Sequence, residues 1–389
     1  MTDVIDPATV LKVPAPYGEF NLGPDRVALL KDGAQAYPAM LAAIAAAQRT
    51  ICLETYILRD DTTGCRFLDA LQAKAAAGVE VLVMYDSWGS AVGLSALGSL
   101  RASGVKVLPF RPLQLLGGPL GRLFVHAFRR NHRKALVVDG RIAFTGGLNI
   151  SDDYASLEDG GHGWRDTHVR IVGPSAQSLE RLFLNTWKRN KGAAPRLELF
   201  RRPRVAGCER IRVIGNEFSL DRKDIRRAYL DAFARARDTI FLTHSYFLPP
   251  AKVLKAMIRA SRRGVRVAVI LAASTDVKLL LFAARGLYGR LLRNRIEVYE
   301  WQGRVLHAKT AVVDTSWSTI GSANLDALSL RQNLEVNAVF QDQPLASAVE
   351  SMFLEDLDHC QRITPQIVKG YGLFHRLLSW LAYQVRHWL

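Results

Sequence analysis

Two segments of the chain carry the same residue types at the same spacing, H-x-K-x4-D. The residues at the fixed positions are His132, Lys134, Asp139, His307, Lys309 and Asp314. Each copy is followed at the same distance by Gly-x-x-Asn, which ends at Asn149 in one case and at Asn324 in the other. One such motif arises by chance in only ~5% of chains of this length. The pair, with its matching tails, therefore indicates one site built from two halves.

These residue types suit substitution at phosphorus. The two lysines can neutralise the nonbridging oxygens, and Asn149 and Asn324 can donate hydrogen bonds to the same oxygens. One imidazole can attack the phosphorus while the other, in its protonated form, gives a proton to the leaving alcohol. Histidines divide these steps well because they titrate near neutral pH. Since this chemistry requires no metal ion, we expect no metal site and no cofactor.

Strand geometry separates the residues of each motif. Side chains alternate between the two faces of a strand, so His132 and Lys134 should point one way and Asp139 the other. The same parity applies to the second copy. Although Asp139 and Asp314 complete the catalytic motifs, we therefore expect them to hold the backbone or a buried polar partner.

Each catalytic histidine also needs an acceptor that orients its second ring nitrogen. Asp166 and Glu335 are the candidates, because each follows its own motif at the head of a plausible strand. A lone carboxylate is more often a surface charge, but occurrence at similar places in both halves favours the orienting role. Glu54 and His244, near the ends of corresponding strands, could both reach the site.

The pattern of secondary structure is duplicated as well. Helices are expected over 37–48 and 67–78, and strands over 50–57 and 79–84. The second half repeats this order with helices over 225–237 and 253–264 and strands over 239–246 and 265–270. Such a duplication indicates two α/β halves with sheets buried under helices.

A basic segment punctuated by Pro and Gly separates the halves. The expected organisation is an N-terminal lead over 1–24, a first domain over 25–195, a linker over 196–207, a second domain over 208–365 and a C-terminal amphipathic helix over 366–389. The helical apolar spacing of the tail suits either a membrane-surface helix or a helix docked on the protein. The extra apolar segment over 111–130 is either a loop packed on its own domain or a lip that touches lipid.

The chain is strongly basic. Its 52 Lys and Arg residues exceed 36 Asp and Glu residues, which gives a formal net charge of +16 over 389 residues. This charge favours polyanions, either nucleic acid or an anionic membrane surface. No segment approaches the roughly 18 to 20 apolar residues of a membrane-spanning helix, and the acidic start does not resemble a signal peptide. With four scattered cysteines, we expect a peripheral protein in a reducing compartment.

The paired motif resembles that of the phospholipase D superfamily. The stretches 142–149, 321–326 and 329–335 are similar to the bacterial cardiolipin synthases, especially the cardiolipin synthase B type, which lacks amino-terminal membrane-spanning helices. The likeness covers most of the chain. It implies an α/β fold of two tandem phospholipase D-like α-β-α domains, each with a mixed buried sheet, related by a pseudo-twofold axis.

The resemblance also implies a reaction that joins two phosphatidylglycerols into cardiolipin and releases glycerol. His132 would be the nucleophile that forms a phosphatidyl-histidine and His307 the acid and base, an order that the pseudo-symmetry leaves open. Asp166 and Glu335 would be the partners of the histidines. The implied location is the bacterial cytoplasm, peripheral on the inner membrane, with an anionic phospholipid surface as partner and no nucleic acid.

Two alternatives remain. A phospholipase D-type phosphodiesterase that hydrolyses phospholipid or nucleic acid would suit the positive charge equally well. The apolar lip and tail argue against nucleic acid, because a groove for it would interleave aromatic with basic residues. A non-catalytic protein that binds polyanions or membranes is disfavoured because both motifs are intact.

Overall fold

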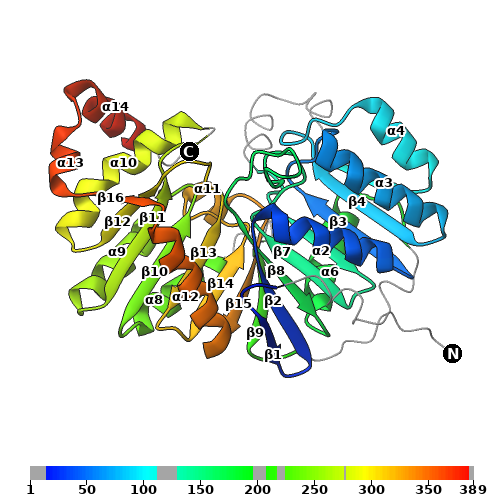
Figure 1. The fold of residues 1–389 in the computed structure, drawn as a ribbon, viewed down its shortest axis with the longest axis horizontal. Coiled ribbons are helices and arrows are strands. Elements are labelled where there is room, and N and C mark those ends of the chain that lie inside the picture. The colour runs from blue at the N-terminus through cyan, green and yellow to red at the C-terminus, as the bar shows by residue number, and fades with distance from the viewer. Residues whose placement is uncertain (1–14, 112–128, 196–206, 217–223, 276, 385–389) are drawn as a thin grey trace. The chain divides into compact units, whose positions relative to one another are not determined.

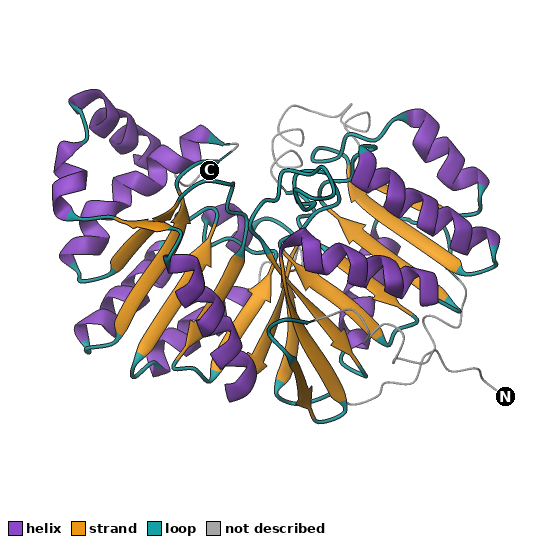
Figure 2. Cartoon of the chain, in the orientation of Figure 1, coloured by secondary structure: helices purple, strands orange, loops and turns teal. Residues whose placement is uncertain are grey.

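The computed structural model describes residues 15–111, 129–195, 207–216, 224–275 and 277–384, without the side chains of 373–377 and 384 (Figure 1). The chain divides into two compact units, Met1–Val213 and Ile214–Leu389. In the described part of the chain there are two eight-stranded mixed sheets, each with helices on both faces (Figure 2). The α/β fold of two tandem domains is therefore confirmed.

The first sheet has three parallel strands at one end and antiparallel strands over the rest. Its order is β1 (Glu19–Leu22), β2 (Asp25–Lys31), β8 (Thr167–Val172), β7 (Ile142–Gly146), β6 (Ala135–Val138), β3 (Thr50–Thr55), β4 (Glu80–Asp86) and β5 (Lys106–Phe110). The helices α2 (Asp32–Ala46), α3 (Thr62–Ala76) and α4 (Leu94–Ala102) cover one face, and α6 (Ala176–Arg189) covers the other. Because both faces are covered, β3 and β4 are buried along their whole length.

The second sheet repeats this arrangement. Its order is β16 (Cys360–Arg362), β12 (Glu297–Trp301), β11 (Arg266–Ala272), β10 (Thr239–His244), β13 (Lys309–Val313), β14 (Trp317–Gly321), β15 (Glu335–Gln341) and β9 (Ile211–Asn216). The helices α8 (Asp224–Arg235), α9 (Ala251–Arg262) and α10 (Lys278–Arg293) cover one face. On the opposite face α12 (Gln343–Leu357) stacks Phe353 on Phe241, with ring centroids 4.7 Å apart.

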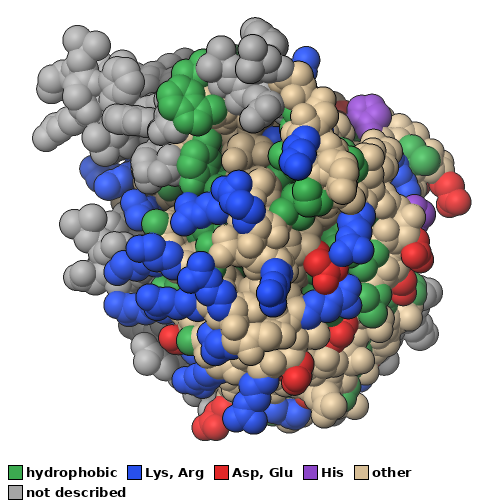
Figure 3. Space-filling model, turned by 90° about the vertical axis from the view of Figure 1, so that its left-hand side faces the viewer, with side chains coloured by type: hydrophobic (Ala, Val, Ile, Leu, Met, Phe, Trp, Pro, Cys, Tyr) green, Lys and Arg blue, Asp and Glu red, His purple; other side chains and the backbone are tan. Residues whose placement is uncertain are grey.

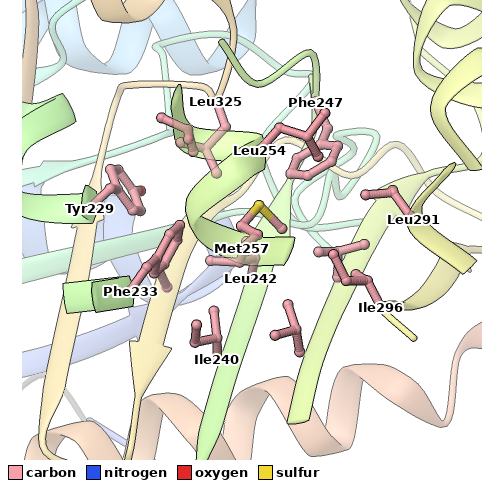
Figure 4. Packing of buried hydrophobic residues seen from close by; sticks show 14 of the residues in the cluster. Tyr229, Phe233, Ile240, Leu242, Phe247, Leu254, Met257, Leu291, Ile296 and Leu325 are labelled. Carbon is pink, nitrogen blue, oxygen red and sulfur yellow. The ribbon is translucent and has the colours of Figure 1, made fainter. Parts of the chain in front are cut away.

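The core of the second unit lies between α8, α9, α10 and the parallel strands. Figure 4 shows Met257 of α9 close to Leu242 of β10, and Leu254 of the same helix nearer to Leu325. The expected helix ends are also present: Gly264 has φ of 99° after α9, and the N–H of Val265 donates to the carbonyl of Ala260 at 3.2 Å. A residue with positive φ is needed there, which explains the glycine between helix and strand.

The C-terminal part forms α13 (Pro365–Gly370) and α14 (Leu373–Gln384), and α14 packs on α10. The close approach depends on Gly286, where a Cβ atom would lie 2.9 Å from the carbonyl oxygen of Ser379. Ala382 is buried, whereas Trp380 and Leu381 are 57% and 49% exposed. Of the two alternatives for the tail, the described helix is thus docked on the protein, with part of its apolar surface still exposed.

Three expectations lie wholly or largely outside the described residues. They are the start of the N-terminal lead (1–14), most of the apolar lip (112–128) and most of the linker (196–206). Among the helices that are described, none is both long and apolar enough to cross a membrane.

Candidate active site

Each motif begins at the carboxyl-terminal edge of the parallel strands in its own sheet. In the first unit β6 runs antiparallel to β3, so the residues just before β6 lie where β3 and β4 end. In the second unit β13 runs antiparallel to β10 in the same way. This edge is where open α/β sheets bind their ligands.

In the first unit a tyrosine packs against both chemical residues of the motif. The ring of His132, which is partly exposed, lies 4.9 Å from that of Tyr56 between centroids. Lys134 is buried, and its Nζ donates to the carbonyl oxygen of His132 at 2.7 Å. The same Nζ lies 5.2 Å from the centroid of Tyr56. Tyr56, which the sequence did not single out, therefore supports the position of the imidazole and the ammonium together.

The segment around His132 is anchored by buried polar side chains on the α6 side. Asn131 Nδ2 donates to the Glu54 carboxylate at 2.6 Å, and Arg133 Nη1 donates to Thr186 Oγ1 of α6 at 2.9 Å. Burial raises the pKa of Glu54, while the charge of Arg133 and the hydrogen bond from Asn131 act against that rise. Glu54 thus contacts the residue next to His132, and its part in the chemistry stays a prediction.

A buried ion pair adds to this anchorage. Arg130 donates to Asp86 at the end of β4 through Nη2 (2.6 Å) and Nε (3.0 Å), and Asp86 also accepts the Asn131 N–H at 2.9 Å. Sequence reasoning missed this pair. Its signal was an acidic residue that ends a run of strand residues, Val-Leu-Val-Met-Tyr-Asp86.

The second unit surrounds its motif differently. His307 and Lys309 are both buried, and Lys309 Nζ donates to the carbonyl oxygen of His307 and to Ser245 Oγ, the latter at 3.1 Å. Ser245 Oγ donates in turn to Asn324 Oδ1 at 2.9 Å. By strand register Ser245 stands where Tyr56 stands in the first unit. A hydroxyl thus links the lysine to the asparagine where the first unit has an aromatic ring.

His244 lies in register with Lys309, directly across the β10–β13 ladder. It is fully buried, and neither ring nitrogen has a hydrogen-bond partner among the described residues. Burial, followed by the charge of Lys309, lowers the pKa of His244 to about 3, so the ring is neutral. By strand register, His244 of the second unit corresponds to Thr55 of the first unit. The sequence pattern had paired His244 with Glu54 instead.

The carboxylates of Asp139 and Asp314 accept hydrogen bonds from backbone N–H groups, as the alternation of side chains along the strand predicted. The Asp139 carboxylate accepts the N–H groups of Gln48, Arg49 and Thr50 at 3.0, 2.8 and 2.7 Å. The Asp314 carboxylate accepts the N–H groups of Arg237, Asp238 and Thr239 at 2.8, 2.8 and 2.9 Å. Each aspartate lies on the order of 20 Å along the extended chain from its histidine, at roughly 3.3 Å per residue. They fix the first residues of β3 and β10, at the ends of these strands that lie farthest from the histidines.

The two asparagines brace the loops that follow the parallel strands. Asn149 Oδ1 accepts the Ile57 N–H at 3.0 Å, and Asn149 Nδ2 donates to the Tyr154 hydroxyl at 2.7 Å. Asn324 accepts the hydroxyl of Ser245. Their contact with phosphate oxygens stays a prediction.

Asp166 and Glu335 are fully buried at the heads of β8 and β15. Asp166 lies against Gly147, where a Cβ atom would approach Oδ1 to 2.1 Å, and it accepts the Thr167 N–H at 2.7 Å. Glu335 Oε2 accepts the Ser322 hydroxyl at 2.5 Å. Both carboxylates are thus positioned by their own units, and their pairing with the histidines stays a prediction.

A family model described as "Cardiolipin synthase, PLD-like domain" matches residues 40–187 and 229–357 of the chain. The chain belongs to this family. Cardiolipin synthase B of Salmonella typhimurium is 34% identical over 379 residues, which cover 93% of this chain and 88% of that protein. Cardiolipin synthase B of Escherichia coli K12 is 33% identical over the same shares. A cardiolipin synthase of Alkalihalophilus pseudofirmus is 30% identical over 90% of this chain and 70% of its own length.

The fold is also found among solved structures. The crystal structure of phosphatidylserine synthase from Haemophilus influenzae superposes with a TM-score of 0.72 at 14% identity, over 93% of this chain and 95% of that one. At that identity the likeness concerns the fold alone. Membership of the phospholipase D-like cardiolipin synthase family makes the chain an enzyme, and its class is that of the phosphatidyltransferases.

One carboxylate of this family member was not singled out from the sequence. Asp326 is buried and caps α11 (Ala327–Arg331), where it accepts the Ser329 N–H at 2.7 Å. Burial raises the pKa of Asp326 to about 7, and the nearby charge of Glu335 adds to the rise. Its counterpart in the first unit is Ser151. Among the described residues, no cluster of His, Cys, Asp and Glu is placed to hold a metal ion.

Proposed function

We propose that this enzyme is a cardiolipin synthase that moves a phosphatidyl group from one phosphatidylglycerol to a hydroxyl of another. The observation that carries the proposal is the repeated arrangement of the motif: in each unit a buried lysine donates a hydrogen bond to the backbone carbonyl oxygen of the motif histidine. The similarity to cardiolipin synthase B over nearly the whole chain supports the substrate class.

The proposed chemistry has two steps at one phosphorus, which requires both units to present their histidines to it. In the first, an imidazole nitrogen of His132 attacks phosphorus, the bond to glycerol breaks, and His307 gives its proton to the glycerol oxygen. In the second, His307 takes the proton of an incoming lipid hydroxyl. That oxygen attacks the phosphorus and releases His132.

The lysines supply the charge for these steps. Lys134 and Lys309 are held by the carbonyl oxygens of their own histidines, so each ammonium is fixed close to the reacting imidazole. Preorganised positive charge in a buried setting stabilises the phosphorane-like oxygens without reorganisation during the reaction. Asn149 and Asn324 would contribute hydrogen bonds at the same place, and Asp166 and Glu335 would orient the histidines.

We further propose that the enzyme works at the inner membrane of a bacterium as a peripheral protein. The net charge of +16 would attract it to an anionic surface, at roughly 1 kcal/mol for each basic residue close to the headgroups. The lipid substrate itself would be extracted from, or reached at, that surface.

The test is incubation of the purified full chain with labelled phosphatidylglycerol vesicles, followed by product analysis. We expect cardiolipin and one free glycerol for each cardiolipin formed. Phosphatidic acid as the main product would indicate a hydrolase instead. Cleavage of DNA or RNA with no lipid product would indicate a nuclease, the alternative that the positive charge supports.

A further inference from the structure

A pocket in the second unit lies beside the loop that carries Asn324. Its volume is about 70 Å³, and it is partly open to solvent. Its walls include Leu248, Pro250, Leu254, Arg290, Arg331 and Tyr383. A volume of this size holds several water molecules, at roughly 10 to 15 Å³ for each, and so has room for a group the size of a phosphate. All of these residues belong to one unit, so the pocket is formed within it.

The pocket carries positive charge without an acidic partner. Arg290 on α10 and Arg331 at the end of α11 are exposed, and neither guanidinium has a hydrogen bond or ion pair to another described residue. Arg226 of α8 stands close to Arg331: burial and then the charge of Arg331 lower its pKa. The Nε of Arg226 is buried and has no hydrogen-bond partner among the described residues. Like charges gathered in this way are stabilised by an anion that neutralises them.

The remaining walls suit the two parts of an amphiphilic anion. The first residue of α9, Ala251, lines the pocket, so the positive end of that helix faces it as well as the guanidiniums. Leu248, Pro250 and Leu254 provide apolar surface next to the charges. Figure 3 views the molecule from the side on which α9, α13 and α14 lie, where Lys and Arg side chains far outnumber acidic ones. The exposed stripe of α9 is Lys252, Lys255, Arg259 and Arg262.

The pocket is connected to the motif loop and to the C-terminal helix. The Leu248 N–H donates to the carbonyl oxygen of Leu325 at 2.9 Å, and Leu325 follows Asn324 directly. Figure 4 shows Leu254 close to Leu325 at the top of the core. Tyr383 of α14 closes another side, and α14 is held there by its close packing on Gly286. An occupant would thus contact both the loop behind Asn324 and the docked tail.

We propose that this pocket binds a phosphate ester, with Arg290 and Arg331 holding the phosphate and the leucine and proline side chains holding the apolar part. Neither motif lysine lines the pocket. The ligand is either a phospholipid headgroup at a membrane surface or a soluble phosphate ester. Identification of the lipid form as a substrate or product rests on the proposed function, whereas occupation of the pocket does not.

The test is hydrogen exchange on the full-length protein, read at peptides that cover 248–254 and 327–331. One series is titrated with sn-glycerol 3-phosphate, and the other with vesicles of phosphatidylglycerol or, for comparison, of phosphatidylcholine. Protection by glycerol phosphate assigns the site to soluble phosphate esters. Protection by phosphatidylglycerol vesicles alone assigns it to the lipid headgroup. Absence of protection at these peptides with both probes overturns the proposal.

The variants are Arg290→Gln and Arg331→Gln, with Arg293→Gln as the matched control. Arg293 is exposed on the same helix as Arg290 and does not line the pocket. Each pocket variant should raise the midpoint of protection about tenfold, because a charge-assisted hydrogen bond to the phosphate is lost. The control should titrate like the unchanged protein. If the pocket variants also did so, the proposal would be wrong.

Cardiolipin formation is measured in parallel to separate this proposal from the proposed function. Protection of the pocket without any cardiolipin would refute the proposed function and leave the pocket assignment in place. Cardiolipin formation without protection would do the reverse. Thermal unfolding of each variant confirms that its fold is intact, which we expect since both arginines are exposed.

Discussion

Replacement of Asp139 by Ala should unfold the first unit more easily and leave the chemistry of folded molecules nearly unchanged. The carboxylate accepts three backbone N–H groups, of which that of Thr50 is buried and those of Gln48 and Arg49 are partly exposed. A hydrogen bond to a charged group is worth about 1.5 to 3 kcal/mol when no water replaces it. We count the Thr50 bond in full and the other two at about half, which gives roughly 3 to 6 kcal/mol.

The backbone adds a further cost. Asp139 has φ of 53°, a left-handed conformation that Asp and Asn tolerate and that costs Ala about 1 kcal/mol. Asp139→Ala should therefore lose roughly 4 to 7 kcal/mol in the free energy of unfolding. Asp139→Asn keeps the oxygen that accepts from Arg49 and Thr50 and should lose only about 1 kcal/mol. Asp314→Ala should lose less than Asp139→Ala, about 2 to 3 kcal/mol, because Asp314 and two of its three donors are more exposed.

The assay is urea unfolding followed by hydrogen exchange of separate peptides, since two units need not unfold together. Activity is measured at low temperature and divided by the folded fraction. The reasoning is refuted if Asp139→Ala keeps full stability while its activity per folded molecule drops by orders of magnitude. That result would show that the carboxylate takes part in the reaction, although it lies at the end of the strands that is far from His132.

Four further outcomes are expected. His132→Ala and His307→Ala should each lower turnover by about a thousandfold or more with unchanged thermal unfolding, and near-normal activity of either would contradict a shared site. Dialysis against EDTA should leave activity unchanged; a loss restored by Mg²⁺ or Zn²⁺ would show a metal requirement. Because the pKa of Asp326 is raised in the folded protein, the contribution of its protonated form to stability is present below pH 4 and is lost as the pH rises to about 7. The free energy of unfolding of Asp326→Asn, compared with that of the unchanged protein, should therefore increase between about pH 4 and 8. A difference that does not change with pH would contradict this. Gly286→Val should loosen α14, seen as faster hydrogen exchange over 378–384, and equal exchange would contradict the docking.

The duplication made most of the fold predictable. The parallel strands β3, β4, β10 and β11 were expected within a few residues of their bounds, because each is a short apolar run that follows a helix. The helices before β4 and β11 also end on a glycine with positive φ. The strands β1, β2, β9 and β16, toward the ends of the two sheet orders, were not expected. Of these, β2, β9 and β16 pair with strands that lie far away in the chain, which local pattern does not report.

The motif residues were found because identity and spacing were repeated, whereas their supports were missed because they are not repeated. Tyr56, Asp86 and Arg130 belong to the first unit alone, and Ser245 belongs to the second. A duplicated sequence reveals what its halves share. Side chains that distinguish the halves become visible only when the sheet brings them to the histidine from other strands.

The difference between the halves bears on the division of roles between the histidines. The segment that carries His132 is held on one side by the buried pair of Arg130 and Asp86 and on the other by the packing of Tyr56. A nucleophile gains from such rigidity, because its nitrogen must stay in line with the bond that breaks. Lys309 instead donates to Ser245, whose hydroxyl proton can rotate about the Cβ–Oγ bond and is donated to Asn324. A histidine that alternately gives and takes a proton is served better by neighbouring hydroxyls that can reorient their hydrogen bonds. This difference favours His132 as the nucleophile and His307 as the acid and base.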